Sequence, residues 1–173
     1  LSMRIAALES AFRSDFPNHS QEIALRTEPL KQLWDGHGPG LLRLIGKLTV
    51  PTLLVESAEV FLVQPIVGGL GYAHLVSNCV HMEGVLTNVD PRLPETVRLA
   101  WLLSQLDLER AVHSEMVDRC DLRRLSGLAM IPPTLLAANE LELCAYNLEG
   151  VETAIKLWQL DDRGSPPRAT AEV

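Results

Sequence analysis

Two features that many functional classes require are scarce in this sequence: cysteine and positive charge. The 173 residues contain three cysteines, Cys79, Cys120 and Cys144, and no two of them form a CxxC pair. This number and spacing fit neither a disulfide framework nor a zinc knuckle. We therefore expect buried free thiols in a reducing compartment, which predicts a cytoplasmic protein.

The chain also lacks a basic surface. Its formal net charge is −7 and its isoelectric point is about 5.2. Proteins that bind nucleic acids neutralise phosphates with clustered Lys and Arg, and anionic membrane surfaces attract the same residues. The one local group, Arg119, Arg123 and Arg124, alternates with Asp118 and Asp121, as a solvated helix face does. We expect no nucleic-acid partner.

Long hydrophobic runs are missing as well. No segment approaches the roughly 20 apolar residues that a membrane-spanning helix needs, so we expect no membrane association. At the start of the chain, Ile5, Leu8 and Phe12 are interrupted by Glu9 and Arg13. That pattern predicts an amphipathic helix and not the apolar core of a signal peptide.

What the chain does contain is an ordinary globular composition, with 47% apolar and 21% charged residues. A chain of this length can bury a sizeable core in one domain. We expect a single domain over residues 1–160. Residues 161–173 are polar and contain proline, so we expect a mobile tail there.

Helical periodicity and proline placement predict most of the remaining elements. A first helix is expected over residues 3–15, and a second begins near Pro29, because proline suits a first helical turn. The run from Gly36 to Gly40 holds three glycines and a proline, so we expect a loop there. The helix predicted over 94–106 has almost no polar face and should lie at the centre of the core. Further helices are predicted over 41–48, 108–117, 122–130, 134–146 and 148–160.

Residues 51–86 have a different character. Branched and aromatic residues occur there in short runs bounded by proline and glycine, which is typical of buried strands. Gly68, Gly69 and Gly71 supply a turn between strands. The sequence thus predicts an α+β fold, with a small antiparallel sheet of three to four strands over about 51–86, packed by helices from both ends of the chain.

The glycine cluster invites comparison with a phosphate-binding loop, but the comparison fails. The run from Val67 to Gly71 does not match GxGxxG, and it leads into a predicted strand. A phosphate loop leads instead into a helix, whose first backbone amides bind the anion. No other cofactor-binding motif occurs in the chain, so we expect no cofactor.

Three side chains in the predicted sheet form a candidate metal centre. His81 and Glu83 alternate on one strand and therefore share a face, and His74 on the neighbouring strand can lie across from them. Two imidazoles and a carboxylate can bind zinc or iron with an open coordination position. The opposing interpretation is that these are polar residues on the solvent face of an antiparallel sheet.

A second candidate for acid–base chemistry is the pair Glu109 and His113, four residues apart on a predicted helix. The sequence contains no GxSxG elbow, and no cysteine is adjacent to a histidine. Partners for a nucleophile can still meet in space, so the sequence leaves that possibility open.

Two functions remain in view. The first is a self-associating binding or protein-interaction module, most simply a homodimer, because apolar segments are abundant and convergent catalytic groups are not. We expect the last helix, with Val151, Ile155 and Trp158, to form part of the interface. The second is a metal-dependent enzyme with its centre at His74, His81 and Glu83.

Overall fold

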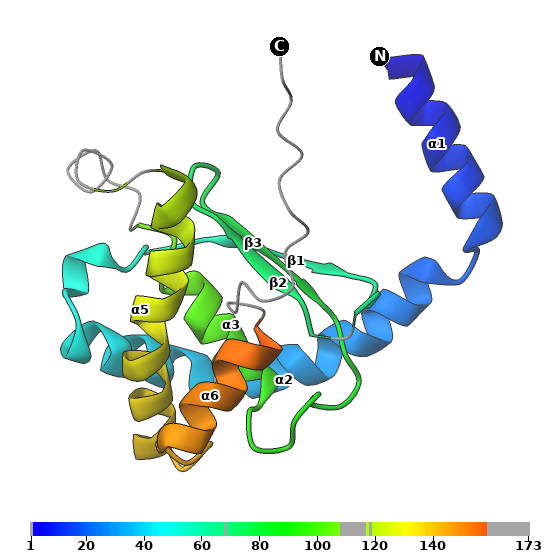
Figure 1. Cartoon of the computed structure of the whole chain (residues 1–173). Coiled ribbons are helices and arrows are strands. Elements are labelled where there is room, and N and C mark those ends of the chain that lie inside the picture. The colour runs from blue at the N-terminus through cyan, green and yellow to red at the C-terminus, as the bar shows by residue number, and fades with distance from the viewer. Residues whose placement is uncertain (1, 68, 108–116, 118, 159–173) are drawn as a thin grey trace.

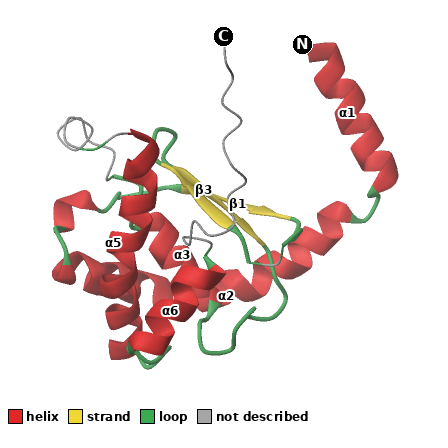
Figure 2. Cartoon of the chain, in the orientation of Figure 1, coloured by secondary structure: helices red, strands yellow, loops and turns green. Residues whose placement is uncertain are grey.

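The computed structural model describes residues 2–67, 69–107, 117 and 119–158 (Figure 1). Helices pack against one face of a small sheet, so the predicted α+β fold is confirmed. Figure 2 shows the sheet beside the helices. The elements are α1 (Ser2–Asp15), α2 (His19–Leu48), η1 (Pro51–Leu53), β1 (Glu59–Val63), β2 (Gly71–His74), β3 (Cys79–Glu83), α3 (Glu95–Leu103), α5 (Arg119–Glu140) and α6 (Leu148–Leu157).

The sheet is mixed, and the prediction of an antiparallel sheet is wrong for its first strand. The strand order is β1-β3-β2, with β3 antiparallel to β2 but parallel to β1. Residues 66, 67, 69 and 70, between β1 and β2, lie at the end of β3, and β1 pairs with the side of β3 opposite β2. A fourth strand at 53–55 is not formed, because η1 occupies its beginning.

The helix at the centre of the core is α3, as the sequence predicts. Every one of its nine residues is buried. One side of α3 packs on β2 and β3, and α5 lies against another side. The ring of Trp101 stacks on Trp158, the residue that follows α6, with centroids 4.5 Å apart. The Nε1 of Trp101 donates to the carbonyl of Gly127 at 2.8 Å. The apolar surface of α3 is thus shared among the sheet, α2, α5 and Trp158.

The prediction of a loop at residues 36–40 is wrong, because α2 continues through these residues as one helix. Leu41 and Ile45 are fully buried, and α2 packs on both α3 and α5. The ring of Trp34 lies over Gly38, where an added Cβ would stand 2.4 Å from the indole. A proline inside a helix costs about 3 kcal/mol. Burial of this helix face outweighs that cost.

The prediction of two separate helices over 122–130 and 134–146 is also wrong. A single helix, α5, covers this region and contains Pro132 and Pro133. Ile131, Leu135 and Ala138 are buried against the core and hold the segment in place. The helix ends at Glu140, so Cys144 lies in the following loop. The predicted helix over 148–160 is confirmed through Leu157.

The last helix does not offer the interface stripe that the sequence suggested. Ala154 and Trp158 are buried, and Val151 and Ile155 pack against the core of their own chain. The stripe is therefore intramolecular, because α5 covers it. The predicted tail at 161–173 lies outside the described residues, and so does nearly all of the predicted helix at 108–117.

Candidate interaction groove and polar sites

The carboxylate of Glu83 binds the loop that crosses the end of its own strand. The backbone amides of Ile66 and Val67 donate to its Oε1 at 2.7 and 2.9 Å. Those of Gly69 and Leu70 donate to its Oε2 at 2.7 and 3.0 Å. Gly69 has a φ of 137°, which only glycine adopts without strain. The glycine-rich run therefore does hold an anion, and that anion is a side chain of this protein.

This arrangement sets the charge state of Glu83. Its side chain is only 4% exposed, and burial by itself would raise the pKa. Hydrogen bonds from the amides of Leu70, Val67, Ile66 and Gly69 outweigh burial and lower the pKa to about 2. The carboxylate is therefore ionised and has its oxygens directed into the loop.

A buried ion pair lies beneath the same loop. Arg98 on α3 pairs with Glu95, and its guanidinium also donates to the carbonyls of Leu70 at 3.1 Å and Glu83 at 2.9 Å. Burial raises the pKa of Glu95 and lowers that of Arg98, and their mutual attraction opposes both shifts. The pair joins α3 to the crossing loop, which is a structural role.

The two strand histidines, whose convergence the sequence left open, are in contact. Nε2 of His74 lies 2.6 Å from Nδ1 of His81, and the ring of Tyr72 stacks on His81 with centroids 5.6 Å apart. All three side chains lie on the sheet face opposite α3, since the buried residues Ala73 and Val80 alternate with them. This face carries a half-buried aromatic cluster.

The third predicted ligand does not join this cluster. Glu83 shares the strand face with His81, but its carboxylate accepts the four loop amides at the end of the strand. Within the described part of the chain, no group of three or more His, Cys, Asp or Glu side chains is arranged to hold a metal ion. The other predicted acid–base pair, Glu109 and His113, lies outside the described residues.

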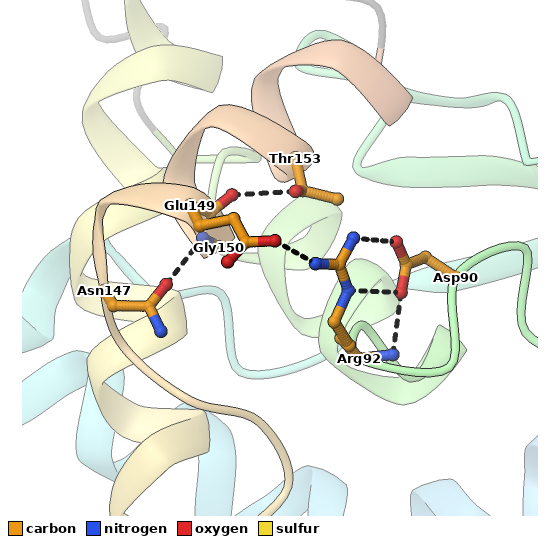
Figure 3. A network of polar contacts seen from close by, with 6 residues as sticks. All are labelled: Asp90, Arg92, Asn147, Glu149, Gly150 and Thr153. Carbon is orange, nitrogen blue, oxygen red and sulfur yellow. Dashed lines mark hydrogen bonds and ion pairs between the residues drawn. The ribbon is translucent and has the colours of Figure 1, made fainter.

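A polar network on the surface ties α6 to the loop before α3 (Figure 3). The guanidinium of Arg92 binds Asp90 at 2.7 Å and also contacts Glu149 at the start of α6. Asn147 caps this helix by accepting from the amide of Gly150 at 2.8 Å. Hydrogen bonds from Arg92 lower the pKa of Asp90 to about 2. The Arg92 and Glu149 side chains are exposed, and exposed ion pairs contribute little to stability.

Two thiols lie in the described part of the chain. Cys79 and Cys144 are free and half-buried. Burial raises the pKa of Cys144, which lies in the loop after α5. A nucleophilic role needs a lowered pKa, so Cys144 is a poor candidate.

A groove with a mostly apolar lining lies between α2 and the edge strand β1 and has a volume of about 350 Å³. Its floor reaches Leu99 of α3, and Lys31 stands exposed at its rim. Val60 and Phe61 of β1 border it and are 41% and 51% exposed. Its other apolar lining comes chiefly from Ile23, Leu30, Trp34 and Leu62.

Beside this groove, α1 points away from the rest of the molecule (Figure 1) and makes no extensive packing contact with any other element in the described ranges. Ile5, Leu8 and Phe12 lie on one side of the helix and are 43% to 71% exposed. The sequence predicted a helix here, and that prediction is confirmed. The periodicity alone could not show that its apolar side faces solvent.

The chain matches no family model, no curated protein and no solved structure. Among the described residues, no helix has both the length and the apolar character that crossing a bilayer requires. A functional proposal therefore rests on the groove, on the histidine cluster and on the contacts of Glu83.

Proposed function

We propose that this protein is an interaction module that self-associates as a homodimer through the groove between α2 and β1. The observation that carries the proposal is the open apolar groove itself, bordered by the exposed side chains of Val60 and Phe61. Exposed apolar patches of this kind are typical of protein-binding surfaces.

The position of β1 strengthens this proposal. It is an edge strand, paired on one side with β3. Apolar edge strands tend to pair with other chains unless charge, proline or another element protects them. β1 carries one exposed charge, Glu59, while Val60, Phe61 and Val63 are apolar and exposed. Covering the groove would remove Val60 from water, which favours association by about 25 cal/mol per Å² of apolar surface.

The alternative of a metal-dependent enzyme has less support. Its three residues are His74, His81 and Glu83, and the carboxylate of Glu83 is committed to the loop amides. At the groove, by contrast, Val60 leaves 41% of its surface exposed to solvent.

Self-association is tested by light scattering coupled to size exclusion, on the wild-type chain and two lysine variants. We expect a wild-type mass near twice the 19.1 kDa of one chain. Val60→Lys, at the groove, should weaken the dimer at least about tenfold, because a buried unpaired charge is costly. Val76→Lys is the matched control, since Val76 is 87% exposed and lies in the β2–β3 turn. A wild-type mass near 19.1 kDa at about 100 µM would overturn the proposal.

A further inference from the structure

We infer that the occupant of the groove is helix α1 of a second copy of the chain, with the two copies exchanging their helices reciprocally. This inference rests on the proposed self-association and adds the element that mediates it. Exchange of an identical element between protomers is a common route to a twofold dimer.

The apolar side of α1 has the spacing that a groove recognises. Ile5, Leu8 and Phe12 stand three and four residues apart and so lie on one side of the helix. Helices that dock in apolar grooves use anchors at this spacing. The groove volume of about 350 Å³ accommodates side chains of this size, and its lining is mostly apolar.

The helix needs a partner to be stable. It has 14 residues, and isolated helices of this length are marginal in water even with favourable composition. Most helical stability in proteins comes from packing an apolar face. In the described parts of its own chain, this face makes ring contacts through Phe12 with Phe16 and His19, while Ile5 and Leu8 are 56% and 71% exposed. Docking would supply the missing contact.

The turn between α1 and α2 holds α1 away from the groove of its own chain. The ring of Phe12 packs on Phe16 with centroids 5.0 Å apart and meets the edge of His19 at 4.9 Å. His19 is itself fixed, because its Nδ1 lies 2.8 Å from Oε1 of Gln64. This cluster keeps α1 pointing outward (Figure 1), where it is placed to reach a neighbouring molecule.

Reciprocal exchange also brings the contact toward the size of a specific interface. A helix of 14 residues is about 21 Å long and 10 Å wide, so docking covers roughly 400 Å² counted on both partners. Twofold symmetry doubles this to roughly 800 Å², and contacts along the β1 edge add to it. Specific interfaces exceed about 1,000 Å².

The experiment separates the occupants of the groove. In the double variant Leu8→Cys with Lys31→Cys, one cysteine is on the apolar side of α1 and the other at the groove rim. Oxidation should give a covalent dimer on a non-reducing gel. A covalent monomer would show that α1 docks in its own groove, which overturns the inference. Ala7→Cys with Lys31→Cys is the matched control, because Ala7 points away from the apolar side, and it should cross-link several-fold less.

A second pair of variants distinguishes this inference from the proposed function. Leu8→Asp should weaken the dimer at least tenfold, whereas Ala7→Asp, with the same new charge on another side of α1, should leave it unchanged. If Leu8→Asp remains dimeric while Val60→Lys becomes monomeric, the groove mediates association and α1 is not its occupant. If the wild type is monomeric, the proposed function itself fails.

Discussion

At the scale of single residues, Glu83 shows that a glycine-rich run can bind a side chain of its own protein and not an external anion. The glycine-rich run that precedes β2 presents backbone amides to an anion, as phosphate loops do. Here the anion is a carboxylate that follows 13 to 17 residues later in the chain. The sequence predicted the turn from its glycines. It could not show which group the amides would meet, because that depends on the end of β3 lying under the loop.

Replacing Glu83 by Gln should reduce the free energy of unfolding by roughly 2–4 kcal/mol, because hydrogen bonds to a charged group are strong and unpaired amides are costly. The amide group of Gln can accept two of the loop amides but turns N–H groups toward the other two. Urea denaturation measures the change. Glu59→Gln is the control, since Glu59 is exposed on the neighbouring strand. A loss below about 0.5 kcal/mol for Glu83→Gln would contradict the role of the carboxylate.

At the scale of elements, local sequence signals succeeded where burial agreed with them. The starts of α3 and α6 and the end of α1 follow from proline, capping and periodicity. The same signals failed at Pro39 in α2 and at Pro132 and Pro133 in α5. In both helices the apolar side is buried by elements distant in sequence, and the free energy of that burial outweighs the local preference for a loop.

The packing of α3 against α6 gives an element-scale prediction. Trp101→Ala should cost roughly 3–5 kcal/mol, because it deletes a large buried aromatic side chain. Trp101 and Trp158 stack with centroids 4.5 Å apart, so the two alanine substitutions should not be additive. In a double-mutant cycle by denaturant titration, we expect a coupling of about 0.5–1.5 kcal/mol. Additive effects would show that the stacking contributes nothing beyond burial.

At the scale of the whole molecule, the candidate groove is a product of the tertiary fold. Its walls come from α2 near residues 23–34 and from β1 at residues 60–62, and its floor from α3. Sequence analysis predicted a surplus of apolar segments but assigned the exposed one to the last helix. That helix proved to be covered, because its stripe packs on α5. Contacts between segments distant in the sequence decide which apolar helix face is buried, and periodicity does not show those contacts.

The stability of the whole molecule should depend on pH through Glu83. Its folded pKa of about 2 is below its ordinary value of 4.5, so the unfolded chain binds the proton more readily. The stabilisation is therefore complete above pH 4.5 and is lost as the pH falls toward 2. The difference in unfolding free energy between the wild type and Glu83→Gln should shrink by about half between pH 7 and pH 3. A difference that stays constant over this range would exclude a lowered pKa.

The order of strands in the sheet also constrains how the protein can fold. The middle strand, β3, is the last of the three in the chain, and it is the one that pairs with both others. Until residues 79–83 have been made and positioned, β1 and β2 have no strand to pair with. A ribosome-bound chain that ends before β3 therefore exposes the apolar side chains of both edges. The pairing of β2 with β3 is a local hairpin, whereas the parallel pairing of β1 with β3 joins residues 20 apart in the chain and is the less local step, of the kind that slows folding.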